Sequence, residues 1–161
     1  MFRYIRSKIF LFVSLLRVGS IKSIPLVNGY TRFTKSTALG MNTNFNGMVI
    51  YGAGPVSIGD NFHSGSGCKI ITESHNYDGE SIPYDKTYKT FKVCIEANVW
   101  LGMNVTIIGD VTIGEGAIIQ VGSVVVSDIP KCAIAGGHPA RVFASRNVEK
   151  YTRLVRQNKF H

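Results

Sequence analysis

The chain has 161 residues, enough for one domain with a real core, and its 45% hydrophobic and 17% charged content excludes a disordered chain. Its net charge of +8 is uneven: residues 1–35 hold seven Lys or Arg and no acid, whereas residues 36–140 hold five basic and nine acidic residues. This distribution argues against nucleic acid as a partner, because a nucleic-acid-binding surface would lie on the folded domain itself. The three cysteines have no metal-ligand spacing, so we expect no metal site, a reducing compartment and a cytoplasmic location.

The first expected element is a basic helical segment over residues 1–35, which starts with MFRYIRSKIFLFVSLLR. Its apolar run ends at Arg17 and is far shorter than the roughly 20 residues that span a bilayer. Residues 1–17 could pack on the domain or on a neighbouring subunit, lie on an anionic membrane surface as a basic amphipathic helix, or act as a secretory signal. No small-residue cleavage site follows, which disfavours the last alternative.

A six-residue repeat dominates the middle of the chain, where the sequence from residue 95 reads IEANVW, LGMNVT, IIGDVT, IGEGAI, IQVGSV and VVSDIP. The first position of every hexad is a branched aliphatic residue, and Gly, Asn and Asp recur between these positions. This period fits neither an α-helix nor an alternating strand. It predicts short strands separated by corners and stacked in parallel coils over residues 36–140, in preference to an ordinary β-sandwich.

These hexads resemble those of the hexapeptide-repeat acyltransferases over roughly residues 40–145, about two-thirds of the chain. The resemblance implies an all-β fold, a left-handed parallel β-helix with short N- and C-terminal helices. The left hand comes from the family, since parallel crossovers are otherwise right-handed.

The six-residue repeat is interrupted between Ile70 and Ile95, where the stretch ITESHNYDGESIPYD begins an expected projecting loop over residues 71–92. By resemblance, His75 near the start of this loop is the catalytic base. An imidazole can take a proton from an attacking hydroxyl or amine and return one to a leaving thiolate. The other three histidines are weaker candidates: His63 lies in a hexad, His138 beside a glycine pair, and His161 is the last residue.

Acceptor-binding residues are expected in the loop and at two points of family resemblance outside it. Asn44, in TNFN, matches an acceptor-contacting Asn of galactoside acetyltransferases with a one-residue difference in spacing, and a corner Asn is an equal alternative. Trp100 would pack against the catalytic His, or else serve as a core residue. The expected substrate-binding set is Asn44, Asn76, Tyr77, Asp78, Tyr84 and Trp100.

The stretch GSVVVSDIPKCAIAGGHPARV resembles the coenzyme A region of the family, which implies acetyl-CoA as co-substrate. Relatives often carry Thr-Lys where this chain has Val126-Ser127, so one phosphate contact is in doubt, with Lys131 or Arg146 as substitutes. The expected cofactor-binding set is Gly102, Gly122, Ser127, Lys131, Gly136, Gly137 and Arg141. Residues 141–161 then carry apolar side chains at helical spacing, which predicts a C-terminal amphipathic helix.

Together these features predict an acetyl-CoA-dependent acetyltransferase acting on a hydroxyl or amine of a sugar or nucleotide-sugar, in surface polysaccharide (O-antigen or capsule) biosynthesis. The resemblance also implies a homotrimer with a site between subunits. Two alternatives stay open: an antibiotic acetyltransferase, and a non-catalytic β-helix that assembles a complex.

Overall fold

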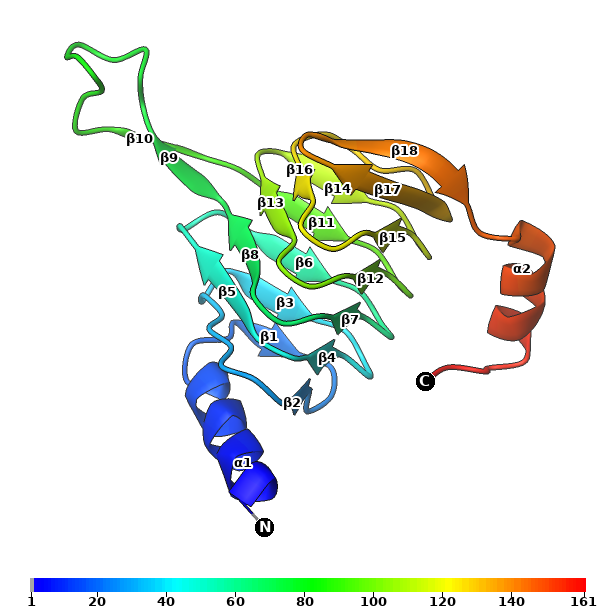
Figure 1. Cartoon of the computed structure of the whole chain (residues 1–161). Helices are drawn as coiled ribbons and strands as arrows, with labels where there is room; N and C mark the ends of the chain where they lie inside the picture. The colour runs from blue at the N-terminus through cyan, green and yellow to red at the C-terminus, as the bar shows by residue number, and fades with distance from the viewer. Residues whose placement is uncertain (1) are drawn as a thin grey trace.

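The computed structural model describes residues 2–161, with side chains from residue 5 onward. Met1 and the side chains of residues 2–4, which belong to the expected basic segment, lie outside the described residues. Helix α1 (Phe2–Leu15) precedes the coils and helix α2 (Val148–Arg156) follows them, as Figure 1 shows. Within the described part of the chain, neither helix has the length and apolarity to cross a membrane.

Between the helices, short strands stack into three sheets that form the faces of a prism (Figure 1). Sheet A contains β1 (Ser20–Ile21), β3 (Thr37–Leu39), β6 (Val56–Ile58), β11 (Val93–Ile95) and β14 (Val111–Ile113). Sheet B contains β2 (Leu26–Val27), β4 (Asn44–Phe45), β7 (His63–Ser64), β12 (Trp100–Leu101), β15 (Ile118–Ile119), β17 (Ala133–Gly137) and β18 (Ala140–Ser145). Sheet C contains β5 (Met48–Tyr51), β8 (Cys68–Ile71), β13 (Thr106–Ile108) and β16 (Val124–Val125). The chain visits the sheets in the order A, B, C, so each complete coil contributes one strand to every face, while the first and last coils reach one face through an isolated bridge only.

The hexads set the register of this stack. Leu101 pairs with Ile119 in parallel, and Ile107 pairs with Val125 in the same way, so three hexads close one coil. The first-position aliphatics are all buried along the axis: Ile95, Leu101, Ile107, Ile113, Ile119 and Val125. The expected parallel β-helix of hexapeptide repeats is confirmed.

Asparagines hold one corner of the prism between sheets A and B. Asn42, Asn61 and Asn98 have φ values of 50°, 55° and 62°, a left-handed conformation that Asn tolerates better than most residues. Their amides form a ladder along the stack: Asn42 Nδ2 donates to Asn61 Oδ1 at 3.0 Å, and Asn61 Nδ2 donates to Asn98 Oδ1 at 2.9 Å. The ladder gives hydrogen-bond partners to the side-chain amides that the corner aligns.

The element boundaries differ from the expected ones at both ends. The first coil starts at β1 rather than near residue 36, because Ser20 and Ile21 already pair with Ala38 and Leu39. At the other end, β18 folds back antiparallel on β17. Residue 141, where a helix was expected to begin, therefore lies in a β-hairpin, and α2 begins only at Val148. Each end thus adds paired backbone to the stack.

Candidate active site

A two-stranded hairpin lifts His75 away from the prism. Strands β9 (Glu73–His75) and β10 (Tyr88–Thr90) pair antiparallel, with Tyr88 opposite His75. The imidazole stacks on the Tyr84 ring with centroids 3.8 Å apart and planes 11° apart, and the Tyr88 ring lies 4.7 Å away. Two aromatic rings therefore fix the direction of an otherwise exposed histidine.

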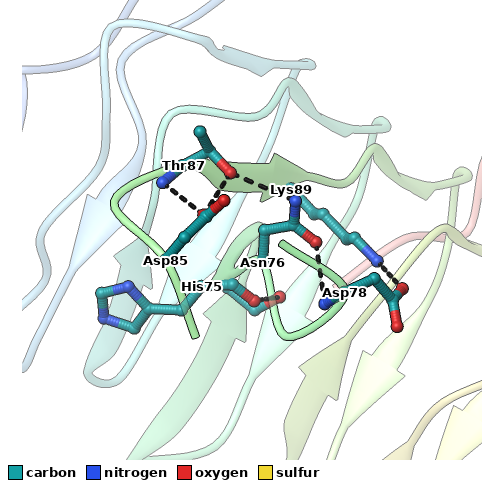
Figure 2. A network of polar contacts seen from close by, with 7 residues as sticks. His75, Asn76, Asp78, Asp85, Thr87 and Lys89 are labelled. Atoms are coloured by element: carbon teal, nitrogen blue, oxygen red, sulfur yellow. Dashed lines mark hydrogen bonds and ion pairs between the residues drawn. The ribbon is translucent and has the colours of Figure 1, made fainter. Parts of the chain in front are cut away.

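Polar side chains of the hairpin form hydrogen bonds and an ion pair with one another (Figure 2). Asp85 Oδ1 accepts hydrogen bonds from the Thr87 amide at 2.8 Å and the Thr87 hydroxyl at 2.5 Å. Asn76 Nδ2 donates to Thr87 Oγ1 at 3.1 Å, and Asn76 Oδ1 accepts from the Asp78 amide at 3.2 Å. Lys89 forms an ion pair with Asp78. Most of the polar groups that break the hexad pattern thus hold the loop in shape.

This network changes the interpretation of the loop residues expected to bind the acceptor. The Asn76 and Asp78 side chains already have partners within the hairpin, so they hold the loop in shape. Tyr77 is exposed, with Lys89 Nζ 4.3 Å from its ring centroid, and Tyr84 supports the imidazole. Their contact with an acceptor stays a prediction.

A second group of candidate residues lines up on the outer face of sheet B. Register places Asn44, His63 and Trp100 side by side on β4, β7 and β12. They line a groove of about 480 Å³ between sheet B and the C-terminal segment, whose walls include Tyr151 and Phe160. Trp100 is half-exposed here, so it is a groove residue and not a core residue.

His63, a weak candidate from its sequence position, also lines this groove. Its Nε2 lies 3.1 Å from Asn46 Nδ2, and since that amide is a donor, the ring nitrogen accepts. Burial, and then the nearby His161, lower the pKa of His63 below its usual value, which keeps the ring neutral. The hexad position of His63 gave no signal for this, because only the sheet register shows that Asn44 and Trp100 flank it.

The chain does not bring His75 and this groove together. The hairpin leaves the prism after β8 of sheet C, whereas Asn44 and Trp100 lie on sheet B. The aromatic contacts of His75 all come from its own hairpin. A site that uses both groups needs a second chain beside the first.

Of the glycines expected to contact coenzyme A, Gly102 and Gly122 lie at the corner from sheet B to sheet C, and Gly136 and Gly137 end β17 of sheet B. A Cβ on Gly102 would lie 2.6 Å from the Val121 amide nitrogen, so close stacking of coils requires glycine there. Gly137 has a φ of 99° and its amide donates to Ser123 Oγ at 3.2 Å. Gly136 pairs with Arg141 on β18. The space beside Gly122 is open, whereas the Gln120 side chain lies against Gly136, so contact of these glycines with a pantetheine arm stays a prediction.

Two of the cations expected near the phosphates of coenzyme A already have partners within the chain. Lys131 Nζ pairs with Glu115 Oε2 at 2.7 Å, and Arg146 Nε donates to the Gly116 carbonyl at 2.6 Å. Lys131 therefore links one coil to the next, and Arg146 holds the C-terminal segment on the prism. Arg141, whose Nη1 donates to the Ala140 carbonyl at 3.0 Å, is exposed on β18, and Ser127 is exposed after β16. Contact of Arg141 with a phosphate stays a prediction. Across residues 2–161, no three His, Cys, Asp or Glu side chains gather as a metal would require.

Comparison with known proteins agrees with this architecture. The bacterial transferase hexapeptide family, described by six repeats, matches residues 95–127. The Vibrio cholerae hexapeptide-repeat acetyltransferase VCA0836, solved with acetyl coenzyme A, superposes with a TM-score of 0.64 at 27% identity over 89% of this chain and 75% of that one. The chain therefore carries the hexapeptide repeat of this family and the coiled fold of the solved relative.

Two further relatives share the repeat. Galactoside O-acetyltransferase of Escherichia coli is 33% identical over 120 residues, which cover 73% of this chain and 58% of that enzyme. A galactoside acetyltransferase in complex with coenzyme A has the same fold, with a TM-score of 0.73 at 24% identity over 92% of this chain and 83% of that one. The chain spans about half the length of curated relatives such as these.

Proposed function

We propose that the protein is an acetyl-CoA-dependent acetyltransferase that modifies a hydroxyl or amine of a sugar. The observation that carries the proposal is the hairpin of β9 and β10, which presents His75 on an aromatic support outside the prism. A hexapeptide-repeat relative solved with acetyl coenzyme A supports the choice of acyl donor.

In this proposal His75 accepts a proton from the hydroxyl or amine of the acceptor. The oxygen or nitrogen of that acceptor group attacks the carbonyl carbon of the thioester. The carbon–sulfur bond breaks, and the thiolate takes the proton that His75 accepted and leaves as coenzyme A, which restores the neutral imidazole. No acyl-enzyme is needed. Cys68 is buried and donates to the Gly102 carbonyl at 3.2 Å, and burial raises the pKa of its thiol, so it is a poor nucleophile.

A homotrimer would complete this site. Side-by-side prisms would bring the hairpin of one chain to the groove of the next, joining His75 to Asn44 and Trp100. Ile82 in the hairpin loop is 99% exposed, and a neighbouring subunit would cover it. Its burial would offset the cost of ordering the projecting loop.

The proposed setting is surface polysaccharide biosynthesis, with a sugar or nucleotide-sugar as acceptor. Relatedness to galactoside O-acetyltransferase supports a sugar, and the groove offers the Asn44 amide beside the Trp100 ring, next to the bonded amides of the asparagine ladder. Amides that hydrogen-bond hydroxyls and an aromatic face are suitable for a pyranose ring. We place the enzyme in the cytoplasm, where an odd number of thiols stays reduced.

The test is acceptor-dependent release of coenzyme A by the purified protein. Hexoses, amino sugars and nucleotide-linked sugars are offered in parallel with chloramphenicol as a representative antibiotic. Turnover with a sugar class supports the proposal, whereas turnover with the antibiotic alone would favour the alternative of drug modification. Binding of acetyl-CoA without turnover on any acceptor would favour a non-catalytic assembly role.

A further inference from the structure

Helix α1 has two apolar faces, and the prism covers only one. Phe10 and Leu11 pack against the core, and Ser14, about one turn further along on the same face, is fully buried. The opposite face carries four exposed apolar side chains: Ile5 at 51%, Ile9 at 56%, Phe12 at 66% and Leu16, in the turn that ends the helix, at 56%. We name these four residues the outer stripe.

The outer stripe is narrow and has cations on both sides. At about 100° of rotation per residue, its four side chains lie within roughly 60° of one another around the helix axis, opposite Ser14. By the same geometry Arg6 falls on one flank and Lys8 on the other, and both are exposed. An apolar strip with flanking cations is the pattern of a helix that lies in a membrane interface.

A cationic pocket opens where the stripe ends. Arg17 follows Leu16 directly and lines a pocket of about 470 Å³ together with Arg32 and Lys35. The Arg32 guanidinium carbon lies 4.9 Å from the centroid of the Tyr51 ring in the pocket wall. Among the described side chains, no acidic group pairs with any of these three cations. The pocket therefore has room and positive charge for a phosphate group.

We infer that the outer stripe and the cationic pocket together dock the protein on a bilayer of anionic phospholipid. The stripe would enter the interface, and the pocket would receive a headgroup phosphate. Figure 1 shows α1 beside the first coil, at the N-terminal end of the β-helix. Docking at this end does not depend on the proposed acetyl transfer.

Charge decides between a membrane and a second copy of the chain as the occupant. Residues 1–35 hold seven Lys or Arg and no Asp or Glu. Stripe-to-stripe pairing would bring two such segments together without a counter-charge, whereas an anionic bilayer supplies one. The apolar stripe alone would suit either occupant; its cationic surroundings suit only the bilayer.

The experiment is cosedimentation of the full chain with vesicles of phosphatidylglycerol and phosphatidylcholine, and with vesicles of phosphatidylcholine alone. We expect binding to the anionic vesicles only, and its loss when salt is raised to about 1 M, where the screening length is about 3 Å. Equal binding to both vesicle types, or to neither, overturns the inference.

Two sets of variants test the two parts of the surface. Arg17→Gln, Arg32→Gln and Lys35→Gln together should weaken binding roughly 100-fold, at about five-fold for each cation near the surface. Ile9→Gln with Phe12→Gln should weaken it at least about ten-fold, since two exposed apolar groups no longer enter the interface. The control is Lys150→Gln, Arg153→Gln and Arg156→Gln on α2, which removes the same charge elsewhere and should preserve binding.

Circular dichroism and sedimentation velocity are recorded on every variant, since a fold defect would mimic lost binding. The inference holds if the α1 and pocket variants stay folded, keep the parent's oligomeric state and leave the vesicles. It is overturned if the stripe variant lowers the oligomeric state, because the stripe is then a subunit contact. Equal loss of binding in the α2 control also overturns it, because general charge would then explain the effect.

Discussion

His63 and His75 have different surroundings, which suit them to different proposed roles. His75 is exposed on the hairpin, stacked on Tyr84. His63 sits partly buried in the groove with its Nε2 held by Asn46. A ring held in this way is suited to line a binding groove, whereas the hairpin histidine can approach a reacting hydroxyl.

We therefore predict that His63→Gln mainly weakens acceptor binding. The Michaelis constant for the acceptor should rise, and turnover should stay within about ten-fold of the parent, because a lost general base would cost roughly 100- to 10,000-fold. Steady-state kinetics over a range of acceptor concentrations measures both parameters. A turnover loss in that larger range would move the base from His75 to His63.

At the scale of elements, α2 docks on the prism through one tyrosine that extends the asparagine ladder. Asn98 Nδ2 donates to the Tyr151 hydroxyl at 2.9 Å, and that hydroxyl donates to Glu115 Oε1 at 2.8 Å. Burial and the bond to Glu115 raise the pKa of Tyr151, so the hydroxyl keeps its proton. No side chain of α2 itself is fully buried, which leaves this polar contact as a main anchor.

Tyr151→Phe should therefore destabilise the protein by about 1–3 kcal/mol, because Asn98 and Glu115 each lose a partner. Thermal or urea unfolding measures the loss, and limited proteolysis of the C-terminal segment locates it. Tyr30→Phe is the matched control: Tyr30 is half-exposed with no hydroxyl bond in the described structure, so its loss should stay within about 0.5 kcal/mol. Equal effects of the two changes would contradict the role given to Tyr151.

Glu115 should make this anchor sensitive to acid. The hydrogen bond from Lys131 is the main reason that the pKa of Glu115 lies below its usual value, with a smaller contribution from Tyr151, while burial opposes the shift. A carboxyl with a lowered folded pKa stabilises the fold above its unfolded pKa of about 4.3, and this contribution disappears as the pH falls through the folded value.

We expect Glu115→Gln to lower stability at neutral pH and to flatten its decline below about pH 4.3. Unfolding midpoints across this pH range test the change, with Glu149→Gln on α2 as a control carboxylate. A stability profile of Glu115→Gln that runs parallel to the parent's would show that Glu115 does not carry the effect.

The sequence predicted the coils well because their register is a local property. Leu101 and Ile119 pair since three hexads separate them, and the period shows this directly. The partners of polar side chains were not predictable in the same way. Asn76 binds Thr87 only because the hairpin sets their register, and Lys131 binds Glu115 because one full coil stacks on the next. Because these partners are not visible in the sequence, Asn76 was expected to bind the acceptor and Lys131 the cofactor. In the structure each has a partner within the chain.

At the scale of the whole molecule, the separation of His75 from the groove predicts complementation between subunits. Mixing His75→Ala with Trp100→Ala, each impaired alone, should restore part of the activity if chains exchange, because some interfaces then carry an intact hairpin and an intact groove. Coenzyme A release from refolded mixtures measures this. Activity equal to the sum of the separate variants would place both residues in a site within one chain.

The central claim is that His75 is the base of an acetyl transfer, and the most direct measurement compares His75→Ala with the parent. Acceptor-dependent release of coenzyme A should fall about 100- to 10,000-fold, while the affinity for coenzyme A, measured by calorimetry, should change little. The hairpin should survive the change, since its Asp85–Thr87 and Asn76–Thr87 bonds do not involve the imidazole. Equal turnover by His75→Ala and the parent would contradict the account.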